Sequence, residues 1–262
     1  MHIAVCIKQI LDPEISPRAF RISPETKRAE QGSASLVPGP FDLNALEVAV
    51  QLKESCGAKV TAVTFGPERA QDVLRRALAM GADEALHVVD EAPGREPAVT
   101  ARVLAAALRM LGKLDLVLCG RQSGEWDDGQ VPGLLAAELG WPYVPFVPRL
   151  AAAGDGFRLE RESDLGVAVV QAPRGVVVSI TNAQDNSPRL PKVRDIMLAN
   201  RKPIRKVTPV ELGVEDALQT SWVEVLDLFV PEVVSRCEFI EGDSGAEKAA
   251  NLVKKLLERK VI

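Results

Sequence analysis

Histidines, paired cysteines and aromatic residues are scarce in this sequence of 262 residues. Because His2 and His87 are the two histidines, a metal site or catalytic triad built on histidine is disfavoured. The four cysteines are widely spaced without a CxxC pair, which favours reduced structural thiols and a cytoplasmic setting. Aromatic residues make up 4% of the chain, which argues against a surface that stacks nucleic-acid bases.

Charge clusters and long apolar runs are also missing. The net charge is −4 and no block of like charges occurs, so a nucleic-acid partner is not favoured. No apolar run approaches the roughly 20 residues that span a bilayer. The first residues, up to Lys8, are typical of a buried strand rather than a signal peptide. We therefore expect a soluble cytoplasmic protein that is not embedded in a membrane.

Familiar phosphate-binding motifs are absent as well. The chain has no GxGxxG fingerprint and no Walker A sequence, and it lacks the Ser-Gly-Gly phosphate loop of ATP pyrophosphatases. These absences argue against an enzyme that hydrolyses a nucleoside triphosphate or uses one to adenylate a substrate.

The first two thirds of the chain alternate short apolar runs with helical patterns. The runs typical of strands covered on both faces are His2–Ile7, Lys59–Phe65, Glu84–Val89 and Leu114–Cys119. Apolar residues at helical spacing occur in Asp42–Ser55, Glu68–Met80, Pro97–Leu111 and Gln130–Leu139. This order predicts an α/β fold, doubly wound, with a mostly parallel sheet.

The pattern changes after Tyr143. Further strands, expected to be peripheral or antiparallel, are predicted at Leu159–Ser163, Gly166–Ala172 and Gly175–Ile180. A Pro-rich stretch and an irregular segment follow, and a last helix is predicted over Ala246–Arg259, which Asp243 or Ser244 could cap.

These patterns predict two parts. Residues 1–206 are expected to form an α/β domain, and residues 207–262 are expected to form an extended C-terminal arm with a helix. The arm has too few periodic signals to bury a core of its own, so we expect it to wrap a partner.

Four segments lie where a ligand of such a fold would bind. In doubly wound sheets, ligands bind beyond the carboxyl ends of the strands, near the change in strand order. The segments expected at such ends are Cys6–Gln9, Pro38–Asp42, Thr64–Pro67 and Gly120–Val131.

The segment Gly120–Val131 carries the clearest signal. It precedes a predicted helix, whose first backbone N–H groups can bind a phosphate, while Gly129 permits close approach and Gln130 offers a further donor. In the competing interpretation, Asp127 or Asp128 simply caps the helix.

The other polar residues of this segment also allow two interpretations. Its carboxylates could accept hydrogen bonds from ribose hydroxyls or an adenine amino group; they are Glu125, Asp127 and Asp128. A metal site or an acid–base pair is the less favoured alternative, because no histidine lies nearby in the sequence. Trp126 could stack on a ligand ring or fill the space between the loop and its neighbours.

Ordered motifs along the chain resemble the electron transfer flavoprotein beta subunit. They are Val5–Gln9, Pro40–Asp42 with Ala45–Glu47, Gln51–Glu54, Leu78–Asp83, Gly120–Val131, Ala137–Pro142, and Pro188-Arg189 followed by Ile196–Ala199. The resemblance extends over nearly the whole chain. It implies an adenine-nucleotide-binding, Rossmann-like fold and a heterodimer with an alpha subunit that holds the redox-active FAD.

The resemblance also implies an AMP bound in this chain with a structural role. Carried over residue by residue, the implied cofactor contacts are Cys6, Gly39, Pro40, Phe41, Asp42, Phe65, Gly120, Arg121, Gln122, Ser123, Gly124, Glu125, Trp126, Asp127, Asp128, Gly129, Gln130 and Val131. Gly129, Gln130 and Val131 would lie at the phosphate, which agrees with the helix-terminus argument. No residue is expected to act as a catalytic acid, base or nucleophile.

Because the sequence departs from the family pattern, FAD is a second candidate for the nucleotide bound in this pocket. Gly39 stands where the family usually has Asn, and Gly124, Glu125 and Trp126 replace more usual residues. Electron-bifurcating relatives hold a second FAD in this pocket and oxidise NADH. In that alternative the chain would have oxidoreductase activity, whereas in the first it is an electron-carrier subunit.

The resemblance implies a docking segment within residues 188–204. The residues expected to contact a partner are Leu190, Val193, Arg194, Ile196 and Met197. Val193 occupies the anchor position, where the family usually has Leu. The implied partners are flavin dehydrogenases, such as the acyl-CoA dehydrogenases of fatty acid oxidation, and a membrane quinone reductase or another acceptor. In the competing interpretation, Val193 and Ile196 pack a short helix against the sheet.

A third function class is a nucleotide sensor of the universal-stress type, which shares the adenine-binding architecture. The docking segment and the long C-terminal arm argue against it, because a sensor that acts alone needs neither.

Overall fold

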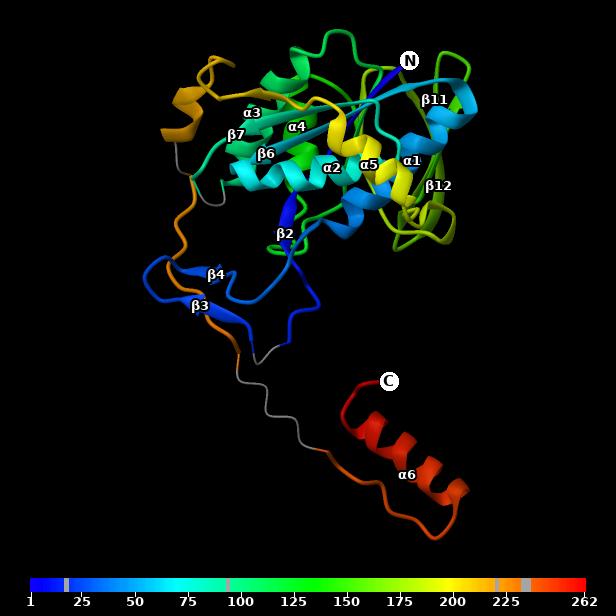
Figure 1. Cartoon of the computed structure of the whole chain (residues 1–262). Helices are drawn as coiled ribbons and strands as arrows, with labels where there is room; N and C mark the ends of the chain where they lie inside the picture. The colour runs from blue at the N-terminus through cyan, green and yellow to red at the C-terminus, as the bar shows by residue number, and fades with distance from the viewer. Residues whose placement is uncertain (17–18, 93–94, 220–221, 232–236) are drawn as a thin grey trace. The chain divides into compact units, whose positions relative to one another are not determined.

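A seven-stranded sheet forms the centre of the structure, a computed structural model that describes residues 1–16, 19–92, 95–219, 222–231 and 237–262 (Figure 1). Its strands are β1 (His2–Cys6), β6 (Lys59–Gly66), β7 (Glu84–Val89), β8 (Leu116–Gly120), β9 (Tyr143–Val147), β13 (Val176–Ile180) and β14 (Arg205–Val207). Their order is β14-β7-β6-β1-β8-β13-β9, and every neighbouring pair is parallel.

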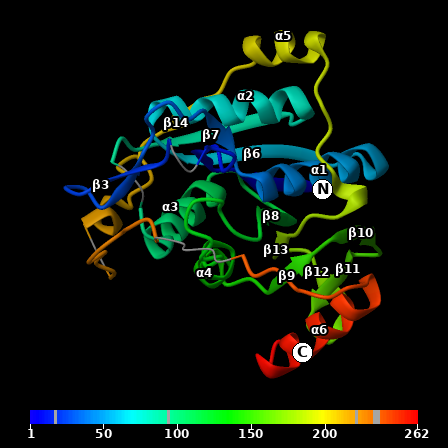
Figure 2. The same ribbon diagram turned by 90° about the horizontal axis from the view of Figure 1, so that it is seen from below.

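Helices cover both faces of this sheet. They are α1 (Pro40–Cys56), α2 (Gln71–Met80), α3 (Pro97–Arg109) and α4 (Val131–Leu139). One buried cluster joins α1 and α2 to strand residues such as Val5, and the other joins α3 and α4 to strand residues such as Ala4. In Figure 2, α2 and α3 lie on opposite sides of β6 and β7. The expected doubly wound α/β fold is therefore confirmed.

Local sequence signals set the helix ends. Helix α1 has Pro40 in its first turn, where a missing N–H costs nothing, and it ends at Gly57, whose φ of 69° is left-handed. Its predicted range, Asp42–Ser55, differs by one or two residues at each end. The predicted helix over Glu68–Met80 divides into a 3-10 turn, η1 (Glu68–Ala70), and α2.

The change in strand order lies between β1 and β8. From β1 the chain adds β6 and then β7 on one side, and it then crosses to place β8 on the other side of β1. The carboxyl ends of β1 and β8 therefore flank the position where doubly wound sheets bind ligands.

Three small antiparallel sheets accompany the central one. They are β10 (Arg149–Ala153) with β11 (Gly156–Ser163) and β12 (Gly166–Pro173), β2 (Gln9–Leu11) with β5 (Leu36–Pro38), and β3 (Arg21–Ser23) with β4 (Arg28–Glu30). The peripheral antiparallel region predicted around Leu159–Ala172 is confirmed.

The prediction that Gly175–Ile180 is also peripheral or antiparallel is wrong. The corresponding strand, β13, pairs in parallel with both β8 and β9 inside the central sheet. Its five residues are all buried, whereas β12 is exposed at most positions. A continuous apolar run such as Val176–Val178 is typical of a strand covered on both faces. The prediction instead grouped this strand with the hairpin strands that precede it in the sequence.

The segment after α5 (Val193–Arg201) returns to the sheet. Strand β14 pairs with β7 at the edge of the sheet, and η3 (Glu215–Gln219) contributes the buried Ala217. A further 3-10 turn, η2 (Gln184–Asn186), precedes α5. By its contacts, the first compact unit runs from Met1 to Leu226.

The second unit, Asp227–Ile262, contains α6 (Gly245–Glu258). Ser244 is its N-cap, because its hydroxyl accepts a hydrogen bond from the N–H of Glu247 at 3.2 Å. No residue of α6 is buried, although Leu252, Val253 and Leu257 are apolar. In the described parts of the chain, no helix is both long and apolar enough to cross a membrane.

Candidate nucleotide site and docking segment

Asp42 joins the two strand ends that flank the change in strand order. It lies in the first turn of α1, and its carboxylate accepts hydrogen bonds from two backbone N–H groups. Lys8, just past β1, donates to Oδ2 at 2.8 Å, and Gly120, the last residue of β8, donates to Oδ1 at 3.0 Å. The structure thus brings together three of the predicted segments: Cys6–Gln9, Pro38–Asp42 and Gly120–Val131.

Two glycines leave room for this carboxylate. A Cβ on Gly120 would lie 2.4 Å from Asp42 Oδ1 and 2.8 Å from the backbone nitrogen of Asp42. A Cβ on Gly39 would lie 2.6 Å from Oδ2. A Cβ at position 39 would therefore require the Asp42 side chain to shift.

The surroundings of Asp42 alter its ionisation. Burial of the carboxyl group raises the pKa of Asp42 to about 6, although the N–H groups of Lys8 and Gly120 act in the opposite direction. The group therefore titrates close to neutral pH.

Arg121 places a positive charge beside this junction. Its guanidinium lies 4.3 Å from the centre of the Phe41 ring, and its Nη1 donates to Thr181 Oγ1 at 3.2 Å. Its Nε is buried and has no hydrogen-bond partner among the described residues. A buried N–H without an acceptor is costly, so this geometry suits an anionic ligand group at Arg121.

The first turn of α4 has no side-chain cap. The residue before the helix, Gln130, makes no such bond, and Asp127 instead accepts from Gln122 Nε2 at 3.1 Å. The interpretation in which Asp127 or Asp128 caps the helix is therefore wrong. Gly129 has a φ of 60°, so the chain turns sharply just before the helix. Backbone N–H groups at this end remain available to a phosphate.

The middle of the segment Gly120–Val131 is bound to the connection that follows β1. Glu125 accepts from Lys8 Nζ at 2.7 Å and from the N–H of Leu11 at 3.3 Å. Trp126 is 48% exposed, so its ring does not fill the space between the loop and its neighbours. In the described part of the chain, no group of three His, Cys, Asp or Glu residues could hold a metal ion.

Two thiols lie at the same strand ends. Cys6 ends β1, and Cys119 lies on β8, which pairs with β1; both are buried and free. The neighbouring Cys6 thiol and burial raise the pKa of Cys119 well above its usual value, so the thiolate is disfavoured. Phe65, from the end of β6, packs against the core on the α3 side. Of these two predicted contact residues, Cys6 is therefore buried in the core, whereas Phe65 is partly buried.

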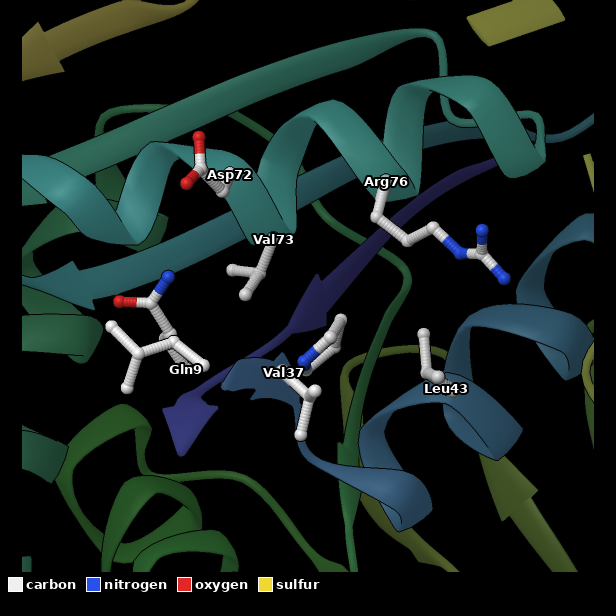
Figure 3. A pocket seen from close by; sticks show the side chains of 8 residues that line it. Gln9, Val37, Leu43, Asp72, Val73 and Arg76 are labelled. Atoms are coloured by element: carbon white, nitrogen blue, oxygen red, sulfur yellow. The ribbon is translucent and has the colours of Figure 1, made fainter. Parts of the chain in front are cut away.

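A separate pocket of about 370 Å³ lies between α2, the start of α1 and the small β2–β5 sheet (Figure 3). Val37, Leu43 and Val73 contribute apolar surface, and Asp72 and Arg76 of α2 are charged residues at its edge. The sequence pattern does not indicate this pocket, because the short strands that close it have no periodic signal.

The predicted docking segment exposes its apolar side chains. Leu190 is 84% exposed and Val193 is 74% exposed, and Ile196 and Met197 are exposed as well. Arg194 is also exposed. Ala199 is the one buried residue of helix α5, and it packs into the core cluster that contains α1 and α2. The interpretation in which Val193 packs the helix against the sheet is therefore wrong.

Arginine side chains form hydrogen bonds at both ends of this docking segment. No pattern in the sequence indicates these contacts. Arg189 donates to Glu47 Oε1 at 2.8 Å and to Glu47 Oε2 at 2.9 Å, and it also pairs with Glu54. Burial opposes ionisation of Glu47, but the hydrogen bonds from Arg189 hold its pKa below the usual value. At the other end, Arg75 of α2 donates to the carbonyls of Ala199 and Lys202.

Comparison with known proteins decides the family. Residues 29–212 match the family described as "Electron transfer flavoprotein domain". The electron transfer flavoprotein subunit beta of Thermoanaerobacterium thermosaccharolyticum is 34% identical, with 100% of each chain covered. The subunit of the same name from Megasphaera elsdenii is 32% identical, again with 100% of each chain covered. This chain belongs to the electron transfer flavoprotein beta-subunit family.

A third similar protein is the caffeyl-CoA reductase-Etf complex subunit CarD of Acetobacterium woodii, which is 33% identical with 100% of each chain covered. The resemblance drawn from the ordered motifs is thus confirmed. The range matched to the electron transfer flavoprotein family contains Asp42, the segment Gly120–Val131 and the docking segment, whereas Lys8 lies before it and α6 lies after it.

Proposed function

We propose that this chain is the nucleotide-binding and docking subunit of a heterodimeric electron carrier. The proposal rests on two features of the chain that follows β8: the buried Arg121 Nε, which has no partner among the described residues, and the start of α4, which has no side-chain cap. A guanidinium and free backbone N–H groups favour a phosphate, and the nucleotide we propose is AMP.

The redox chemistry in this proposal lies on the alpha subunit. That partner would hold the FAD, and electrons would pass from flavin dehydrogenases, such as acyl-CoA dehydrogenases, to a quinone reductase or another acceptor. This chain would supply no acid, base or nucleophile. The part of its C-terminal arm that forms the second unit, Asp227–Ile262, would wrap the alpha subunit with the exposed apolar residues of α6.

The cofactor content tests the nucleotide assignment. We expect acid treatment of the heterodimer, purified after co-expression of both subunits, to release FAD and AMP in equal amounts. Chromatography of the released compounds, against standards, measures the ratio. FAD in twofold excess over protein with no AMP would contradict the assignment and support the second candidate function.

The second candidate is an electron-bifurcating protein with FAD in this pocket that oxidises NADH. One observation favours it: Trp126 exposes its ring at the loop of the proposed site, where an isoalloxazine ring could stack. Under this alternative, NADH would bleach the flavin absorbance of the purified heterodimer, whereas an AMP-binding carrier would not respond.

The docking assignment can be tested at Val193. We expect Val193→Ala to slow electron delivery from an acyl-CoA dehydrogenase about fivefold at limiting concentration, since a partly buried contact of about 1 kcal/mol is lost. Flavin content should not change. Stopped-flow reduction of the bound flavin measures the rate.

Val167→Ala is the matched control, because Val167 on β12 is also exposed and undergoes the same truncation. An equal slowing in both variants, or a loss of flavin in Val193→Ala, would show that Val193 is not a docking residue.

A further inference from the structure

The carboxylate of Asp42 is committed to the protein's own backbone. Each oxygen accepts from one N–H group, Lys8 on one side and Gly120 on the other. These donors lie 112 residues apart in the sequence and belong to the two strand ends that flank the change in strand order. Asp42 therefore bridges the two edges of the proposed nucleotide site at its base.

A second contact joins the same two chain segments farther out. Glu125 in the β8–α4 loop contacts Lys8 Nζ and the N–H of Leu11. The connection after β1 and the loop after β8 are thus held together at two levels, by Asp42 and by Glu125. Glu125 is exposed and exchanges its partners with water easily, whereas Asp42 is partly buried and both of its carboxylate oxygens are bonded to backbone N–H groups.

We propose that Asp42 is a positioning residue whose carboxylate holds the ends of β1 and β8 at the separation that nucleotide binding requires, by acting on the backbone and not on the ligand. The inference rests on the nucleotide site proposed above. It adds that the affinity of this site depends on a group that the phosphate does not touch.

Ionisation of Asp42 controls the bridge. A carboxylate accepts charge-assisted hydrogen bonds from both N–H groups, whereas in a protonated carboxyl the bonds lose the charge and the hydroxyl oxygen is the weaker acceptor. The charged or titratable groups around it are Lys8, the thiols of Cys6 and Cys119, and Arg121, whose guanidinium lies over the neighbouring Phe41 ring. With a pKa of about 6, the carboxyl changes state between neutral and mildly acidic pH.

Affinity and stability should respond to this proton in opposite directions. The folded-state pKa of Asp42 is raised above its unfolded value of about 3.9, so the folded state binds the proton more tightly. This group therefore favours the folded state increasingly as pH falls from about 7 towards 4. The same proton weakens the hydrogen bonds of the bridge, so nucleotide affinity should fall.

Titration of AMP into the nucleotide-free heterodimer, from about pH 8 to about pH 5, tests the inference. We expect the wild-type dissociation constant to rise about tenfold through this range, as for the loss of one charge-assisted hydrogen bond. Asp42→Asn should bind weakly at every pH. AMP's own phosphate also titrates near pH 6, so the difference between the two proteins at each pH is the diagnostic quantity.

Gly39→Ala provides an independent variant, since its Cβ would displace the Asp42 carboxylate. We expect it to weaken AMP binding in the wild type and to have no further effect in an Asp42→Ala background. Equal affinities and pH profiles for wild type and Asp42→Asn would overturn the inference while leaving the nucleotide site intact. An absence of AMP binding by the wild type at any pH would refute both.

Discussion

Replacement of Arg189 with methionine is expected to lower the free energy of unfolding by roughly 2–4 kcal/mol at neutral pH. The reason is Glu47, whose side chain is 6% exposed and would remain as a charge without its main partner. Breaking a fully buried ion pair costs about 3–5 kcal/mol. The expected loss of stability is smaller here, because the Arg189 side chain keeps 33% of its surface exposed. Urea denaturation followed by circular dichroism measures the change.

The sign of the pH dependence follows from the depressed pKa of Glu47 in the folded state. Its ion pair stabilises the protein above the unfolded pKa of about 4.3, and this contribution is lost as pH falls through the folded-state value. The difference between wild type and Arg189→Met should therefore shrink in acid. The double variant Glu47→Gln with Arg189→Met should recover most of the lost stability, and failure to recover would show that charge burial is not the cause.

Arg121→Met is expected to raise the dissociation constant for AMP about 10- to 100-fold, since an ionic hydrogen bond to a phosphate contributes roughly 1.5–3 kcal/mol. Methionine keeps the apolar contact with the Phe41 ring while removing the guanidinium and its buried Nε. Calorimetric titration of AMP into the nucleotide-free heterodimer measures the effect.

Arg158→Met is the control for this experiment. Arg158 is an exposed residue of β11 that pairs with Glu160 on the same strand, so its loss should leave AMP affinity unchanged. If Arg121→Met binds AMP as tightly as the control does, the guanidinium does not contact the phosphate.

Periodicity in the sequence predicted the central elements well. The strands β1, β6, β7 and β8 and the helices α1 to α4 lie close to their predicted ranges, because a strand buried on both faces and an amphipathic helix each leave a pattern within a few residues. The short strands β2 and β5 left no such pattern, since each has three residues. They are held by pairing with each other, and they close the pocket of Figure 3.

The candidate site was partly predictable for the same reason. Strand ends followed by a glycine-rich polar loop indicated Gly120–Val131, and the rule for doubly wound sheets placed Cys6–Gln9 beside it. The role of Asp42 was not predictable from spacing, because its two hydrogen-bond donors come from strands that are remote in sequence.

The sequence alone determined the family, the alternation of strands and helices, and the segments that converge at one edge of the sheet. These properties can be inferred from local residue patterns and from the order of the motifs. The tertiary structure decided which groups meet: Asp42 with Lys8 and Gly120 and Arg121 over Phe41 at that edge, and Arg189 with Glu47 at the docking segment. Such contacts depend on the strand order of the sheet, and strand order is set by the packing of the whole fold.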